Sequence, residues 1–101
     1  MDTDQIFQHA RARFEHAAAR RVLKEKYEAK MIFAHAGGMW RATPESLALL
    51  SLFADEDIVM LDLYDTPVRI NAQEMRQLMR QRWQEQMTAW LLEHQELSKQ
   101  R

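Results

Sequence analysis

The chain of 101 residues has room for one domain, residues 1–101, and is too short for a second core. It contains no cysteine, which excludes a disulfide framework, a thiolate metal site and a thiol nucleophile. Because it has neither an apolar run of membrane-spanning length nor the apolar segment of a signal peptide, we expect a cytoplasmic protein without membrane contact.

Charge is spread unevenly along the chain, although the net charge is only −1. Residues 1–42 carry eight basic and five acidic side chains, a net of +3. Residues 43–67 carry six acidic side chains and no basic ones, a net of −6. Residues 68–101 carry six basic and four acidic ones, a net of +2. Self-association by opposite charge fits this layout at least as well as nucleic-acid binding does.

A long helix is predicted over about residues 4–35. Residues 5–34 contain no Gly or Pro and are rich in strong helix formers. Apolar residues keep helical spacing around Phe7 and Phe14, and again around Leu23, but the stripe shifts sideways between the two sets. We therefore expect no continuous coiled-coil seam. Gly37-Gly38 is expected to end the helix as a left-handed C-terminal cap.

The middle of the chain, residues 37–70, is predicted to form a compact helix and hairpin unit. Thr43-Pro44 is typical of a helix start, and the apolar residues that follow, up to position 53, indicate a short core helix. Residues 58–64 indicate a strand with Val59, Leu61 and Leu63 on one face. Asp65-Thr66-Pro67 supplies turn chemistry before a second strand at residues 68–70.

A second long helix is predicted over residues 72–98, opened by a capping sequence that starts at Asn71. The expected fold class is therefore α+β and mostly α. Its order is a long helix, a short core helix, a β-hairpin and a long helix, with roughly two-thirds of the residues helical.

Side chains capable of chemistry do not converge in the sequence. His9 and His16 stand seven apart, whereas helical metal-binding pairs usually stand four apart, and no third ligand is evident nearby. Residues 55–57 are acidic but lack the ligand spacing and the glycine of a calcium loop. We expect no catalytic residue, no cofactor, no metal and hence no enzyme.

The strongest candidate surface is a stripe on the last helix. Large apolar side chains recur there at spacings of three and four, and such a stripe is either intramolecular core or part of an interface. We expect a homo-oligomer, or binding to another protein, through a helix–helix contact in which the first helix forms the second wall. The candidate interaction residues are Phe7, Phe14, Met79, Trp83, Met87, Trp90 and Leu91.

An accessory nucleic-acid binder is the alternative function. Basic residues give the first helix a bias that suits phosphate contact, namely Arg11, Arg13, Arg20, Arg21 and Lys24. Acidic residues interrupt this run, and the pI of about 6.4 is far from the basic footprint of such proteins. We therefore place protein–protein interaction first, in an assembly or regulatory factor, and do not expect nucleic acid as a partner.

Three segments together resemble small hypothetical proteins of T4-like tailed bacteriophages. They are KYEAKMIFAHAGGMWRATPE at residues 26–45, IVMLDLYDTPVRIN at 58–71 and WQEQMTAWLLEHQEL at 83–97. The similarity spans the chain from about Phe14 onward, and its markers are the GG-aromatic-TPE junction and the LD-Y-TPV hairpin. The resemblance implies a protein of the infected-cell cytoplasm or of the virion. It implies no activity and no functional residue.

Overall fold

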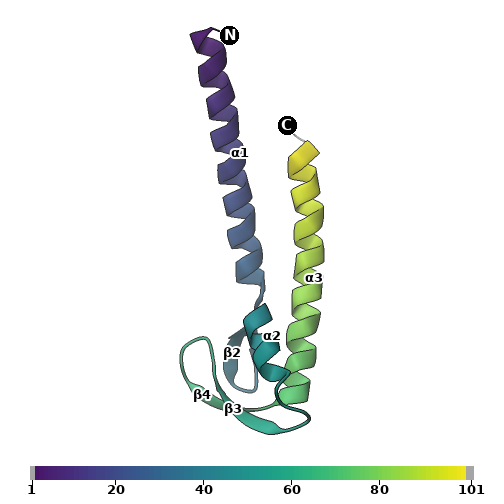
Figure 1. Ribbon diagram of the computed structural model, residues 1–101. Coiled ribbons are helices and arrows are strands. Elements are labelled where there is room, and N and C mark those ends of the chain that lie inside the picture. Colours follow the sequence, from purple (N-terminus) through teal and green to yellow (C-terminus); the bar gives the residue numbers. More distant parts are fainter. Residues whose placement is uncertain (1, 100–101) are drawn as a thin grey trace.

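The computed structural model, which describes residues 2–99, consists of a small head and a long two-helix stem (Figure 1). The stem is formed by α1 (Thr3–Lys30) and α3 (Ala72–Lys99), which lie side by side and run in opposite directions. Residues 31–71 between them form the head. The molecule measures 65 × 24 × 21 Å. Helices make up 64% of it, which confirms the predicted α+β, mostly α class.

The first helix begins as predicted but ends earlier. Asp2 caps it, because its carboxylate accepts the N–H of Gln5 at 2.8 Å while the Gln5 side chain accepts the N–H of Asp2. The helix ends at Lys30, so the predicted end at residue 35 is wrong. Ile32 and Phe33 are residues that favour extended backbone. The predicted helix continues past them because no glycine or proline interrupts the chain there.

An unpredicted hairpin follows α1, made of β1 (Ile32–His35) and β2 (Gly38–Arg41). Its two-residue turn has φ of +53° at Ala36 and +81° at Gly37. Positive φ at both central positions is the signature of a type I′ hairpin turn. The two glycines therefore serve a hairpin instead of a helix cap. His35, expected at a helix end, is a strand residue paired with Gly38.

The short helix α2 (Pro44–Leu50) starts where the sequence predicts. The Thr43 hydroxyl accepts the N–H of Ser46 at 3.1 Å, with Pro44 in the first turn. At the other end, the guanidinium of Arg76 on α3 donates to the carbonyls of Leu50 and Phe53 at 2.9 and 3.0 Å. The first carbonyl belongs to the last turn of α2 and the second to the loop after it, so Arg76 fixes the exit of the helix against α3.

The prediction that the whole apolar run of α2 lies in the core is wrong. Leu50 is buried, but Leu49 and Leu52 are exposed. The helix packs mainly against α3, so one side of it meets the core and the opposite side faces outward.

The second hairpin joins β3 (Asp57–Leu61) to β4 (Pro67–Asn71), and Asn71 then caps α3 through the N–H of Glu74. Ile58 and Met60 face the core, whereas Val59 and Leu61 face outward. The apolar face expected from the sequence is therefore the outer face. The strand also stops at residue 61, three residues before the predicted end, because a turn begins at Asp62.

Asp62 organises this turn and connects the two hairpins. One carboxylate oxygen accepts the N–H groups of Tyr64 and Thr66 at 2.9 and 3.0 Å. The other accepts the N–H of Met39 at 3.1 Å, and the N–H of Leu63 donates back to the carbonyl of Met39 at 2.7 Å. The bond from Thr66, followed by those from Met39 and Tyr64, lowers the pKa of the Asp62 carboxyl.

The hydrophobic core lies in the head and at the foot of α3. It draws residues from both hairpins, α2 and α3, and Trp40 also donates its indole N–H to the carbonyl of His35 at 2.8 Å. Its buried members are Met31, Phe33, Trp40, Ala42, Leu50, Ile70, Ala72, Met75 and Met79. The upper stem lies outside this core, so its side chains have fewer neighbours of their own chain.

Candidate interaction surface

One aromatic contact joins the two helices of the stem above the head. The rings of Tyr27 on α1 and Trp90 on α3 are stacked, with centroids 5.9 Å apart and planes 6° from parallel. Glu93 accepts hydrogen bonds from the Tyr27 hydroxyl and from the Lys26 ammonium, the latter at 2.6 Å. The ring stack therefore joins α1 to α3, and Lys26 and Glu93 form a charged rim beside it.

The contacts of this charged rim shift the pKa values of Lys26, Tyr27 and Glu93. The Lys26 ammonium, followed by the Tyr27 hydroxyl, lowers the pKa of the Glu93 carboxyl. The hydrogen bond to Glu93 in turn raises the pKa of Lys26 and of Tyr27. At neutral pH the carboxylate thus accepts from both donors.

The Trp/Met stripe of α3 faces this seam and the head. Met79 is 1% exposed, and Trp83 and Met87 are half-buried against the core of the head. Trp90 meets Tyr27, whereas Leu91 is exposed. Within the chain, α1 meets this stripe at the stack of Tyr27 on Trp90, whereas the expected contact between subunits stays a prediction.

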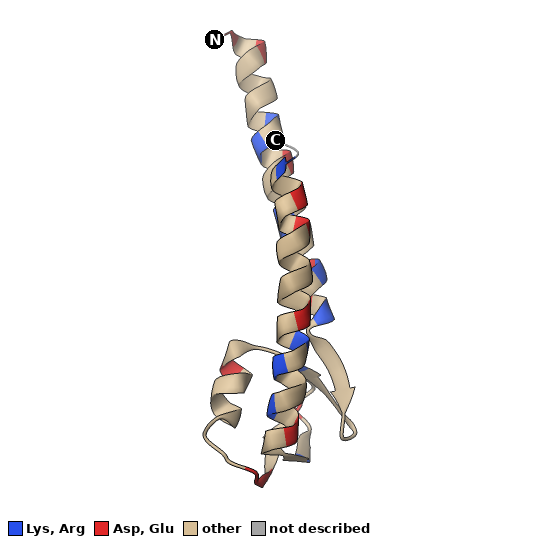
Figure 2. Ribbon diagram, turned by 90° about the vertical axis from the view of Figure 1, so that its right-hand side faces the viewer, with Lys and Arg blue, Asp and Glu red and all other residues tan. Residues whose placement is uncertain are grey.

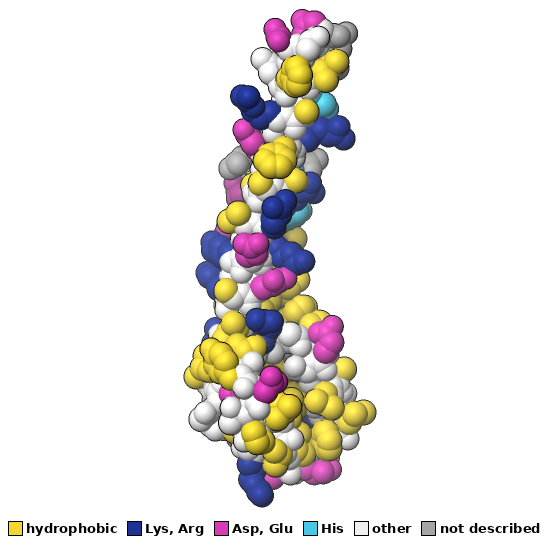
Figure 3. Space-filling view, turned by 90° about the vertical axis from the view of Figure 1, so that its left-hand side faces the viewer, with side chains coloured by type: hydrophobic (Ala, Val, Ile, Leu, Met, Phe, Trp, Pro, Cys, Tyr) yellow, Lys and Arg dark blue, Asp and Glu magenta, His cyan; other side chains and the backbone are white. Residues whose placement is uncertain are grey.

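The sideways shift of the apolar stripe on α1 separates two different faces. Leu23 and Tyr27, which are 8% and 2% exposed, lie on the face that meets α3. Phe7 and Phe14, which are 68% and 71% exposed, lie two helical turns apart on the opposite side. Figure 3 views the molecule from the α1 side and shows hydrophobic side chains recurring along the stem.

We call this second stripe the outer face of α1. It consists of Phe7, Ala10, Phe14 and Ala17, at spacings of three and four. Every described side chain from residue 2 to residue 15 is exposed. The outer face therefore has no cover within the described chain. In the sequence, the sideways shift of the apolar stripe near Arg20-Arg21 indicates this second face. A stripe that changes sides along a helix cannot pack against one neighbour over its whole length.

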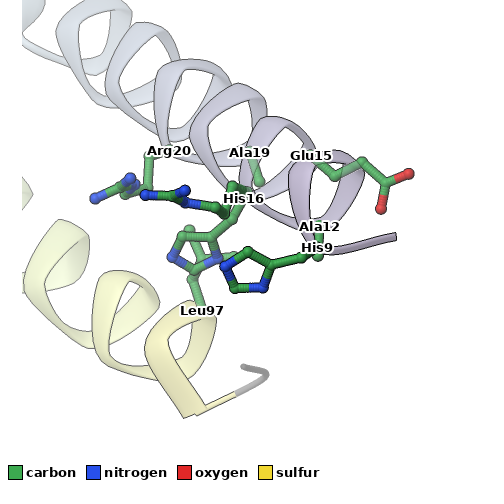
Figure 4. A pocket seen from close by; sticks show the side chains of 8 residues that line it. His9, Ala12, Glu15, His16, Ala19, Arg20 and Leu97 are labelled. Atoms are coloured by element: carbon green, nitrogen blue, oxygen red, sulfur yellow. The ribbon is translucent and has the colours of Figure 1, made fainter. Parts of the chain in front are cut away.

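A groove lies where α1 continues past the end of α3. It encloses about 660 Å³, and Figure 4 shows side chains of α1 pointing across it towards α3. Its lining residues are His9, Ala12, Arg13, Glu15, His16, Ala19, Arg20 and Leu97. Within residues 2–99 no three His, Asp or Glu side chains are placed to hold a metal ion together. The groove brings together no nucleophile and base.

The basic residues of α1 do not share one face. Arg13 and Arg20 line the groove. Lys24 forms an exposed ion pair with Glu28, with 3.7 Å between Nζ and Oε1. Arg11 and Arg21 lie outside the groove lining. Figure 2 shows the positions of basic and acidic residues interleaved along both helices. The candidate phosphate-binding surface is thus dispersed around the helix and interrupted by acids.

The outside of the head carries a second set of exposed apolar residues among acidic ones. They are Leu49, Leu52, Val59, Leu61 and Tyr64. Residues 31–71 contain six acidic and two basic side chains, a net of −4, whereas α1 contains seven basic and four acidic ones, a net of +3. The two surfaces that lack cover thus belong to parts of the molecule with opposite charge.

Comparisons of the chain with protein-family models, with curated proteins and with solved structures find no match. Within residues 2–99, neither long helix is apolar enough over its length to cross a membrane.

Proposed function

We propose that this protein is a non-enzymatic interaction protein, an assembly or regulatory factor that self-associates through the outer face of α1. The observation that carries the proposal is the exposure of Phe7 and Phe14 on a face of α1 that no other part of residues 2–99 covers. Surface aromatics in a periodic stripe are typical of helix–helix interfaces.

Helix energetics support a partner for this segment. Isolated helices of fewer than about 12–15 residues are marginal in water, because most helical stability in proteins comes from packing of an apolar face. The upper part of α1 has such a face, and among the described residues nothing packs on it. Burial of Phe7 and Phe14 at an interface contributes about 1.5–3 kcal/mol for each side chain.

The surface area of the molecule points the same way. The chain exposes 7467 Å², whereas a compact monomer of 12.0 kDa exposes about 6,000 Å². The excess of about 1,500 Å² for one chain is more than the area of about 800 Å² that each partner buries in a standard protein–protein interface. A second copy of the chain is a partner that is always present at matching concentration.

The test is sedimentation velocity over a dilution series, with wild type compared to the double variant Phe7→Ser with Phe14→Ser. We expect wild type to sediment as an oligomer at tens of micromolar and the variant as a folded monomer. Leu92→Ser is the matched control, because Leu92 is also an exposed apolar residue, at 59%, but lies on the other helix. A wild type that is monomeric throughout contradicts the proposal.

A second arm of the same experiment adds DNA or RNA at two salt concentrations. We expect no co-sedimentation at physiological salt. Tight binding that weakens steeply with salt contradicts a function in protein–protein interaction and favours one in nucleic-acid binding.

A further inference from the structure

Resting on the proposed self-association, we propose that two copies pair antiparallel along α1, so that the free end of each α1 lies against the head of the other copy. This arrangement names the partner of the outer face. It is the α1 of a second copy in the middle of the stem and the acidic, partly apolar head of that copy at the end.

Towards the head, the side of α1 that carries the outer face continues with charged residues. Positions 7, 14 and 21 are seven apart and 25 follows four later, so Arg21 and Glu25 continue the face of Phe7 and Phe14. In an antiparallel pair centred on position 23, Arg21 of each copy lies level with Glu25 of the other, since both are two residues from the centre. Arg21 of each copy then forms an ion pair with Glu25 of the other copy, which gives two such pairs.

A parallel pair has the opposite consequence. It places Arg21 beside Arg21 of the other copy and Glu25 beside Glu25. Like charges at such close positions are destabilising. The charges on the outer face therefore select the antiparallel direction.

Helix geometry then places the aromatic residues. At 1.5 Å per residue, Phe14 lies about 14 Å and Phe7 about 24 Å from position 23 on one side. The helix ends at Lys30, about 10 Å from position 23 on the other side. In the antiparallel pair both phenylalanines thus extend beyond the partner's α1 and lie beside its head.

The head offers a surface that suits them. Tyr64 is 72% exposed in the turn between β3 and β4, which projects on the α1 side of the molecule (Figure 1), and Leu61 precedes it. Figure 3 shows hydrophobic side chains over the head on the same side as the outer face. The part of α1 that lies beside the partner's head, residues 3–15, carries two basic and two acidic side chains. Its contact with the head therefore rests on apolar side chains, and the charges of Arg21 and Glu25 set the direction of the pair.

Distances between spin labels test the direction, and the absence of native cysteine makes single labelling clean. Two exposed positions away from the outer face are used, Gln8→Cys and Val22→Cys. The antiparallel pair places the two labels at position 8 about 45 Å apart along the stem, since each lies fifteen residues from the centre. The labels at position 22 then lie within about 20 Å, because packed helices are 8–10 Å apart.

Short distances at both positions overturn the antiparallel direction and leave self-association intact. Absence of any intermolecular distance at either position overturns self-association itself. A charge exchange gives an independent readout of the same direction. Arg21→Glu alone is expected to weaken the dimer at least several-fold, and addition of Glu25→Arg to restore it. Failure of the double variant to recover contradicts the antiparallel pairing of these two positions.

Discussion

The carboxylate of Asp62 accepts the backbone N–H of Met39 at 3.1 Å, although the two residues are 23 positions apart and belong to different hairpins. A two-stranded hairpin is marginal by itself. Each hairpin of the head has only two strands, and this bond, with the return bond from Leu63 to Met39, ties them together. One ionised side chain therefore contributes directly to the contact between the two hairpins.

Replacement of Asp62 by Asn should destabilise the protein at neutral pH, because the amide supplies one acceptor oxygen where the carboxylate supplies two. The pKa of Asp62 is lowered in the folded state, so the unfolded chain binds its proton more readily. The stability from Asp62 is thus fully present above the unfolded pKa of about 3.9 and is lost as the pH falls through the folded value.

The measurement for Asp62 is the free energy of unfolding of wild type and Asp62→Asn at several pH values. The difference should be largest near pH 7 and should shrink below about pH 4. A difference that does not vary with pH means that the charge of Asp62 plays no part in holding the head.

Ala36 occupies a position that suits asparagine better. Its φ of +53° lies in the left-handed region, which L-residues with a Cβ avoid, and Asn-Gly is the favoured pair for a type I′ turn. We expect Ala36→Asn to raise the free energy of unfolding by about 0.5–1 kcal/mol. An unchanged or lower melting temperature would speak against the assigned turn geometry.

Gly37 and Gly38 resist substitution for different reasons. Gly37 has φ of +81°, so Gly37→Ala should cost about 1 kcal/mol through backbone strain alone. A Cβ at Gly38 meets the Trp40 ring at 3.1 Å and Cβ of Asp62 at 3.2 Å, so Gly38→Ala crowds the contact between the hairpins. Chemical denaturation of the two single variants measures both costs. Equal stability of the double variant and wild type rules out this account of the turn.

Trp90 should matter for the stem of each chain more than for assembly. Loss of its stack on Tyr27 in Trp90→Ala should lower the free energy of unfolding by about 2 kcal/mol, roughly half the cost of a fully buried tryptophan. The exposed neighbour Leu91 provides the control, since Leu91→Ala should stay within about 0.5 kcal/mol of wild type. Dissociation of Trp90→Ala without loss of stability would instead locate Trp90 at a subunit contact.

Local signals in the sequence predicted much of the fold. Thr43-Pro44 and Asn71 marked two helix starts correctly, and the 3.6-residue period of α3 located its buried face. The β1–β2 hairpin escaped prediction because its strands are four residues long and continue a helix-favouring stretch without a break. Gly37-Gly38 is compatible with a helix cap and with a hairpin turn, and only the pairing of Phe33 with Trp40 decides between them.

The candidate surface was harder to predict than the fold. Periodicity shows that Trp83 and Trp90 share a face with Met79, but it does not say whether the wall opposite belongs to the same chain. That depends on the head, which turns α3 back along α1. Once α3 lies beside Leu23 and Tyr27, Phe7 and Phe14 remain on the uncovered side.

The most direct test of the central claim, self-association through the outer face of α1, is the molar mass of the wild-type protein in solution. Light scattering at tens of micromolar should give about twice the chain mass of 12.0 kDa, and Phe7→Ser with Phe14→Ser should return the value to that of one chain. A wild-type mass of one chain over the whole concentration range contradicts the claim.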